Sequence, residues 1–248
     1  MRAAADIPEP ALPTGVRAIS RFDDDWPAWL DFPGAPVVVF YRGSLPPGGG
    51  IAIVGTRNPT GFGARAVRAC TETIVDLIPG TFSGVVSGLA RGVDTLAHNA
   101  ALAAGIPTWA ILGSGVDVPT PSVNIRLAER IMEAGGGLLS EQVPGTEPSK
   151  GTLIARNRLQ VASSSRVFIA ECGLPSGTLH TARYAIEQSR KMIVARPTSA
   201  RDNASTTTEG NRRLLDPRGC DPSDLGASGE IAERIRSRRP VADASLPV

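Results

Sequence analysis

Residues 85–98, VVSGLARGVDTLAH, decide the fold of this chain. The β-branched pair Val85-Val86 ends a buried strand, Ser87-Gly88 turns the chain, and the spacing predicts a helix over residues 93–104. This unit brings small residues, Arg91 and the free N–H groups of a helix N-terminus to one point, as an anion-binding site does. The loop alone leaves a second interpretation open, in which its glycines only permit a tight turn.

Strands and helices alternate in the same way on both sides of this unit. The predicted strands are 51–54, 82–86, 108–112, 138–140, 166–170 and 191–195, and the predicted helices are 61–76, 93–104, 122–133, 152–162 and 178–189. The strands are apolar without alternation, which is typical of a parallel sheet covered on both faces. The predicted fold class is therefore α/β, with a doubly wound, mostly parallel sheet of extended Rossmann-like type in a single main domain.

Three segments differ in composition. Residues 1–20 are rich in Ala and Pro and are expected to form a loosely ordered lead-in. Residues 21–220 carry the main domain, which opens with a short aromatic helix near Trp26 and a strand over 37–41. Residues 221–248 are expected to be a C-terminal extension, either a last amphipathic helix or a basic tail.

Composition narrows the functional classes. The 248 residues are 42% hydrophobic and 20% charged with a net charge of +2, which is typical of a soluble domain with a core and argues against a strongly basic polyanion binder. Three scattered cysteines and two histidines predict neither a disulfide framework nor a metal site, and they favour a cytoplasmic location. No apolar run reaches membrane-spanning length, so no membrane association is expected.

Small residues, hydroxyls and arginines follow the predicted strands. The carboxyl ends of parallel strands meet at one edge of a sheet, so these residues are expected to share one rim. They are Gly55-Thr56-Arg57, the run from Ser87 to Asp94, Gly113-Ser114-Gly115 and Ser176-Gly177-Thr178. The sequence therefore predicts a polar groove that tolerates anions.

The loop over residues 55–63, GTRNPTGFG, is not a cofactor motif. It lacks the spacing G-x-G-x-x-G, no P-loop motif occurs, and no acidic residue ends the second strand to hold a ribose. A dehydrogenase and a P-loop ATPase are both disfavoured, and no cofactor is expected. Arg57 directly follows a strand-end glycine, where a phosphate partner explains an arginine better than a core role does.

Asp94 and His98 lie four residues apart on one predicted helix face, so they could pair. No serine or cysteine is tied to His98 by the sequence, so packing is favoured over catalysis. Asp94 is expected to hydrogen-bond loop amides near Arg91. Both are interpreted as residues that organise the site, and no catalytic residue is assigned.

A second polar cluster brackets the start of the helix over 152–162. It contains Lys150 and the run Arg156-Asn157-Arg158. Arg156 and Arg158 are two positions apart and cannot share one helix face. One of them should reach the groove while the other forms a salt bridge or points elsewhere, and a solvated basic face is the alternative. Ser176-Gly177-Thr178 suits either an anion or simple N-capping.

Together these motifs resemble the DNA-processing protein A family (DprA, also called Smf). The resemblance covers about residues 21–220 and rests on AIVGTRNPTGFG (52–63), VVSGLARGVDTLAHNAAL (85–102), AILGSGVDVPTPSVNIRLAERI (110–131), GGLLSE (136–141), ARNRLQVASSSRVFIAE (155–171), SGTLHTARYAIEQSR (176–190) and EGNRRLL (209–215). It implies a non-enzymatic mediator of DNA recombination that binds single-stranded DNA. It further implies a homodimer that helps to load RecA onto incoming DNA during natural transformation.

The resemblance also implies roles for individual residues. The residues that would contact phosphates are Arg57, Arg91, Lys150, Arg156 and Arg158. The residues that would let the DNA strand approach the protein backbone closely are Gly55, Ser87, Gly88 and Gly92. Thr56 and Asn157 complete the predicted DNA-binding set, and Asp94, His98, Ser176, Gly177 and Thr178 would organise it.

The chain also departs from the family pattern. Leu153-Ile154 stands where the family usually has Phe-Pro, so an aromatic that could stack on a base is missing. The stretch over residues 172–175, CGLP, replaces a run that is usually small and charged. No winged-helix domain is expected after about residue 220, so the chain resembles a minimal, Rossmann-core member.

An enzyme or sensor for a nucleotide-like small molecule is the alternative. Related Rossmann folds include nucleoside-monophosphate phosphoribohydrolases, whose Pro-Gly-Gly-x-Gly-Thr signature is absent here and only faintly echoed at residues 175–178. Glu171 lies nearby, but no second carboxylate has an assignable catalytic geometry.

Overall fold

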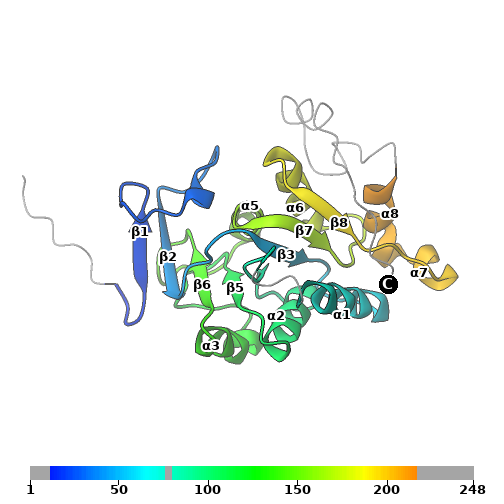
Figure 1. Ribbon diagram of the computed structural model, residues 1–248, viewed down its shortest axis with the longest axis horizontal. Helices are drawn as coiled ribbons and strands as arrows, with labels where there is room; N and C mark the ends of the chain where they lie inside the picture. Colours follow the sequence, from blue (N-terminus) through cyan, green and yellow to red (C-terminus); the bar gives the residue numbers. More distant parts are fainter. Residues whose placement is uncertain (1–11, 76–79, 217–248) are drawn as a thin grey trace, which may run out of the picture.

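The computed structural model describes residues 12–75 and 80–216. Its strands form one sheet in the order β1-β2-β6-β5-β4-β3-β7-β8 (Figure 1). Their bounds are β1 Arg17–Ser20, β2 Val38–Gly43, β3 Gly50–Val54, β4 Val85–Ser87, β5 Thr108–Ile111, β6 Gly137–Ser140, β7 Ser164–Ile169 and β8 Lys191–Val194. All pairs from β6 through β8 are parallel, and only the β1–β2 and β2–β6 pairs are antiparallel. The predicted mostly parallel sheet is confirmed.

Helices cover both faces of the sheet. Figure 1 shows α1, α2 and α3 along one face and α5 and α6 along the other. The helices are α1 Gly61–Val75, α2 Val93–Ala103, α3 Ile125–Glu133, α4 Lys150–Ala155, α5 Asn157–Ala162, α6 Gly177–Glu187, α7 Ala200–Ala204 and α8 Glu209–Leu215, with 3₁₀ turns at Ala28–Leu30, Ser122–Asn124 and Thr206–Thr208. This is the doubly wound, Rossmann-like arrangement that the alternation predicts.

The central strand β3 explains why its sequence is apolar without alternation. Ile51 and Ile53 belong to the core formed with α1 and α2, whereas Ala52 and Val54 belong to the core formed with α6. Successive side chains of a strand point to opposite faces, so a strand buried on both faces needs an apolar residue at every position.

The segment before the main fold is more ordered than predicted. Arg17–Ser20 forms β1, which pairs with β2, and the Arg17 guanidinium lies 4.5 Å from the centroid of the Tyr41 ring. The expectation of a loose lead-in is therefore wrong for these residues, because pairing with β2 provides the order that local composition does not indicate. Residues 1–11 and the predicted extension over 221–248 lie outside the described residues.

The predicted helix over 152–162 is divided at Arg156. α4 ends at Ala155, α5 begins at Asn157, and Arg156 joins them with its side chain turned into the protein. Across residues 12–75 and 80–216, no helix is long and apolar enough to span a membrane, and no group of three or more His, Cys, Asp or Glu residues could hold a metal ion.

Candidate nucleic-acid interface

A pocket of about 720 Å³ opens at the carboxyl ends of the central parallel strands. The loop after β3, the β4–α2 loop, the α4–α5 segment and the start of α6 form its walls. Of the residues predicted for the rim, the pocket is lined by Gly55, Thr56, Arg57, Asp94, Lys150, Arg156, Asn157, Ser176, Gly177 and Thr178. The fold thus brings together four chain segments that the sequence places more than 120 residues apart, from Gly55 to Thr178, as expected for a doubly wound sheet.

Positive charge dominates this pocket. The lining residues include three cationic side chains, which are those of Arg57, Lys150 and Arg156. They include a single carboxylate, that of Asp94. Arg57 and Lys150 are exposed, whereas Arg156 is 5% exposed. Burial lowers the pKa of Arg156, and the charge of Arg57 contributes to lowering it further. An excess of positive charge in a partly enclosed site attracts anions.

Arg156 and Asp94 form a buried pair beneath the mouth. Arg156 Nη2 lies 3.5 Å from Asp94 Oδ2, and Arg156 Nη1 donates to the Ile111 carbonyl at 2.6 Å. Burial raises the pKa of Asp94, and the charge of Arg156 and the amide of Ala90, which donates to Asp94 at 3.2 Å, oppose that rise. Burial likewise lowers the pKa of Arg156, and Asp94 opposes that change. The predicted hydrogen bond from a loop amide to Asp94 is present, so Asp94 connects the β4–α2 loop to Arg156.

The glycines of the rim serve contacts within the protein. A Cβ atom on Gly88 would lie 1.6 Å from Arg156 Nη1, and one on Gly92 would lie 2.4 Å from the Thr56 carbonyl oxygen. Ser87 and Gly88 are buried and do not line the pocket, and the Ser87 hydroxyl donates to the Ile53 carbonyl at 2.7 Å. The expectation that Ser87 and Gly88 let DNA approach the backbone is therefore wrong, because the protein's own groups occupy that space.

Arg158 lies outside the pocket. Its Nη1 and Nη2 donate to the two carboxylate oxygens of Glu141 at 2.6 and 2.5 Å, and its Nε donates to the Gly34 carbonyl at 3.0 Å. Helical spacing correctly predicts that only one of Arg156 and Arg158 reaches the groove. The assignment of Arg158 to DNA is corrected, because a bidentate ion pair holds its guanidinium elsewhere.

Arg91 is exposed on the β4–α2 loop and does not line the pocket, although its neighbour Ala90 does. Contact between Arg91 and a ligand would therefore require the ligand to extend beyond the mouth.

His98 is buried in the core and does not line the pocket, so its assignment as a site-organising residue is wrong. Its Nδ1 lies 2.8 Å from Thr108 Oγ1, and that hydroxyl donates its only hydrogen to the Val85 carbonyl at 3.0 Å. Nδ1 must therefore carry the ring hydrogen and donate it. Nε2 has no hydrogen-bond partner among the described residues. The pair with Asp94 does not form, because Asp94 points to Arg156 instead.

Acidification should destabilise the protein through His98. Burial and the charge of Arg156 lower the pKa of His98 from 6.5 to about 3. The folded state thus keeps His98 neutral, while the unfolded state takes up a proton below pH 6.5, so stability present at pH 7 is lost as the pH falls. Between pH 7 and pH 5 we expect this group to remove about 2 kcal/mol. The free energy of unfolding in urea, measured at pH 7 and pH 5, should fall by about 2 kcal/mol more for the wild type than for His98→Leu. An equal fall for both proteins would contradict this prediction.

Ser176 caps α6, since its hydroxyl accepts from the Thr178 amide at 3.2 Å. The capping interpretation of this segment is confirmed, and its residues line the pocket as well. The sequence analysis missed Gln160, His180 and Thr181, which also line it. Helical spacing was the available signal, because Gln160 lies four residues after Arg156 and His180 four after Ser176.

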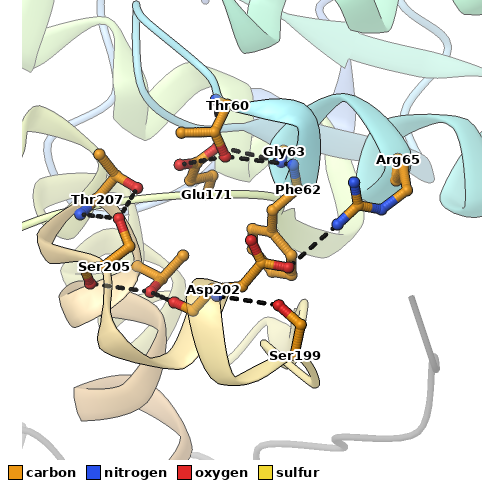
Figure 2. A network of polar contacts seen from close by, with 10 residues as sticks. Thr60, Phe62, Gly63, Arg65, Glu171, Ser199, Asp202, Ser205 and Thr207 are labelled. Carbon is orange, nitrogen blue, oxygen red and sulfur yellow. Dashed lines mark hydrogen bonds and ion pairs between the residues drawn. The ribbon is translucent and has the colours of Figure 1, made fainter.

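Glu171 occupies the N-terminus of α1 (Figure 2). It is fully buried, and its Oε2 accepts from the amides of Thr60 at 2.8 Å and Gly63 at 3.0 Å, while the Thr60 hydroxyl donates at 3.1 Å to Oε1. Figure 2 also shows Arg65 of α1 pairing with Asp202 of α7, at 3.1 Å. Dinucleotide-binding folds place a pyrophosphate at the corresponding helix end. Here the carboxylate of Glu171 accepts hydrogen bonds from the amides at that helix end.

The sequence matches the family described as DNA recombination-mediator protein A over residues 17–218. It is 39% identical over 183 residues to Protein Smf of Synechocystis sp., which covers 69% of this chain and 44% of that relative. It is 37% identical over 196 residues to DNA processing protein DprA of Streptococcus pneumoniae, which covers 76% of this chain and 65% of that relative. The chain thus spans only about half to two thirds of these relatives.

Two solved structures share the fold. The X-ray structure of DNA processing protein A from Streptococcus pneumoniae superposes with a TM-score of 0.73 at 32% identity, over 88% of this chain and 75% of that one. The structure of DNA processing protein A from Helicobacter pylori, which concerns its single-stranded DNA binding mode, gives a TM-score of 0.67 at 25% identity, over 90% and 94% of the two chains.

Proposed function

Because this chain belongs to the DNA recombination-mediator protein A (DprA/Smf) family, we propose that its pocket binds single-stranded DNA and that the protein mediates DNA recombination without being an enzyme. The observation that carries the proposal is the pocket at the strand ends, where Arg57 and Lys150 are exposed at the mouth above the buried Arg156. Exposed cations suit the phosphates of a strand, and the DNA-binding mode of the Helicobacter pylori relative supports the same ligand class.

In this proposal the DNA-binding set is smaller than the sequence suggests. It consists of Gly55, Thr56, Arg57, Lys150, Asn157 and the segment 176–178 at the pocket, with Arg91 contacting a phosphate outside the mouth. Arg156 is buried in the pocket lining and contributes a fixed positive charge, and its contacts with Asp94 and the Ile111 carbonyl connect the neighbouring segments.

Removing a cation from the mouth should weaken DNA binding in a salt-dependent way. Each phosphate contact contributes about 0.7 to the slope of log affinity against log salt for single strands. We expect Arg57→Ala and Lys150→Ala each to lower that slope by about 0.7 and to weaken binding several-fold at low salt. Fluorescence anisotropy with labelled oligo-dT at several salt concentrations measures both quantities.

Arg68→Ala is the matched control, because Arg68 is exposed on α1 and does not line the pocket. Its slope should equal that of the wild type. Wild-type binding that is absent at micromolar protein, or that does not depend on salt, would refute the proposal.

The wider role proposed here follows from family membership. The protein would work in the cytoplasm as a homodimer and help to load RecA onto incoming single strands during natural transformation. Sedimentation analysis tests the dimer. RecA filament formation on strands coated with single-strand-binding protein, with and without this protein, tests the loading step.

A phosphoribohydrolase-type enzyme has less support. Glu171 is the carboxylate that such an activity would need nearby, but it is buried and bound to Thr60 and Gly63 at the end of α1. Release of adenine from AMP by the purified protein would overturn this judgement.

A further inference from the structure

Leu89 in the β4–α2 loop has a backbone conformation that a leucine rarely adopts. Its φ is +62°, in the left-handed region, and its side chain is fully buried. A side chain makes this region unfavourable, so a residue stays there only where its surroundings hold it, and such residues are concentrated at functional sites. Arg91 follows two positions later. The contacts that hold Leu89 therefore also set the course of the chain at Arg91.

Asn124, in the 3₁₀ turn that precedes α3, supplies these contacts. Its Nδ2 donates to the Leu89 carbonyl at 2.7 Å and to Thr95 Oγ1 at 2.8 Å. The Thr95 hydroxyl gives its single hydrogen to the Ala90 carbonyl at 2.7 Å, so both groups that Asn124 reaches can only accept. Asn124 is 4% exposed, which makes water a poor substitute for it. One side chain thus restrains two successive carbonyls of the loop, the first directly and the second through Thr95.

The position of Arg91 depends on this backbone. Its side chain is exposed, and within residues 12–75 and 80–216 no hydrogen bond or ion pair engages its guanidinium. Asn124 does not line the pocket, and a separate contact, from the Ala90 amide to Asp94 at 3.2 Å, holds the loop on the pocket side. Removing Asn124 should therefore displace Arg91 and leave the cations that line the pocket in place.

We propose that Asn124 is a positioning residue for DNA binding. It holds Leu89 in the left-handed conformation and thereby places Arg91 outside the mouth of the pocket, where a phosphate of the bound strand meets it. Asn124 acts through the β4–α2 loop and does not touch the DNA. This inference rests on the proposed binding of single-stranded DNA.

The test combines substitutions at Asn124 and Arg91 and measures the slope of log affinity for oligo-dT against log salt. Arg91→Ala should lower that slope by about 0.7, the contribution of one phosphate contact on a single strand. Asn124→Leu keeps a side chain of similar size but removes both donors, so it should lower the slope by the same amount. Adding Arg91→Ala to Asn124→Leu should then lower it no further. A residue that only stabilises the fold would leave the effect of Arg91→Ala undiminished.

Two further variants separate this effect from unfolding. Asn99→Leu is the matched control, because Asn99 donates to the Thr95 carbonyl at 3.0 Å and its hydrogen bonds do not reach the β4–α2 loop. It should keep the wild-type slope and the full effect of Arg91→Ala. Thr95→Val keeps the side-chain shape and removes the hydroxyl that joins Asn124 to the Ala90 carbonyl. It should reduce the effect of Arg91→Ala even if Asn124→Leu does not fold, and cooperative unfolding in urea shows which variants are folded.

The outcomes distinguish this inference from the function on which it depends. An undiminished effect of Arg91→Ala in folded Asn124→Leu or Thr95→Val protein would overturn the role of Asn124. A wild-type slope that Arg91→Ala leaves unchanged would also overturn it, while DNA binding at the pocket would stand. Absence of salt-dependent binding by the wild type would overturn the proposed function itself.

Discussion

Replacing Arg156 with methionine should destabilise the protein by about 3–5 kcal/mol, because it leaves the Asp94 carboxylate buried without its partner. Arg156 and Asp94 are each 5% exposed, so water replaces little of the lost interaction. The change also leaves the Ile111 carbonyl without the hydrogen bond that Arg156 Nη1 donates at 2.6 Å. Methionine occupies much of the same volume, so loss of charge and of hydrogen bonds dominates the effect over cavity formation.

The free energy of unfolding in urea measures this effect, and Arg126→Met is its matched control. Arg126 pairs with Glu129 at 2.8 Å, but its side chain is 75% exposed, so the same substitution there should cost less than about 1 kcal/mol. Adding Asp94→Asn to Arg156→Met should recover part of the loss, with a coupling energy of about 0.5–3 kcal/mol. Purely additive effects would show that the two side chains do not act as a pair.

Gly92→Ala should cost about 3 kcal/mol or more and should also impair DNA binding. Gly92 has a φ of +81°, and a Cβ atom there would lie 2.4 Å from the Thr56 carbonyl oxygen and 2.5 Å from the Arg57 carbonyl carbon. The backbone conformation costs about 1–3 kcal/mol for a residue with a side chain, and the overlap with backbone adds to it. Relief requires the loop after β3 to move, and that loop carries Arg57 to the mouth of the pocket.

Gly135→Ala separates the cost of the backbone conformation from the cost of the overlap with neighbouring backbone atoms. Gly135 has a φ of +83°, but a Cβ atom there would meet nothing within 4 Å. It should therefore show only the conformational cost and leave anisotropy titrations with oligo-dT unchanged. If Gly92→Ala proves no more destabilising than Gly135→Ala, the tight packing of the two loops is not what requires glycine at position 92.

Secondary structure and the position of the pocket were predictable because their signals are local. Runs such as Ile51–Val54 are apolar at every position, which indicates a strand buried on both faces, and the residue after each strand falls at the same rim of a parallel sheet. β1 was missed because the signal for it is not local. Its order comes from pairing with β2 about 20 residues later, and nothing within Arg17–Ser20 indicates that partner.

Side-chain partners were not predictable, because they are distant in the sequence. Spacing shows that Arg156 and Arg158 point in different directions, but only the fold shows that the first meets Ile111, 45 residues away, and the second meets Glu141. The sequence offered Glu171 as a possible catalytic carboxylate, and the structure assigns it to Thr60, 111 residues away.

By itself, then, the sequence determined the α/β class, the family and the rim of the sheet at which the pocket lies, since periodicity and the ends of strands are encoded residue by residue. The tertiary structure alone decided which rim residues are free for a ligand. It left Arg57 and Lys150 exposed, and it engaged Arg158 and Glu171 in contacts elsewhere in the protein. Whether a polar group is free depends on which groups the packed chain brings to it, and burial makes each of those pairings or vacancies energetically significant.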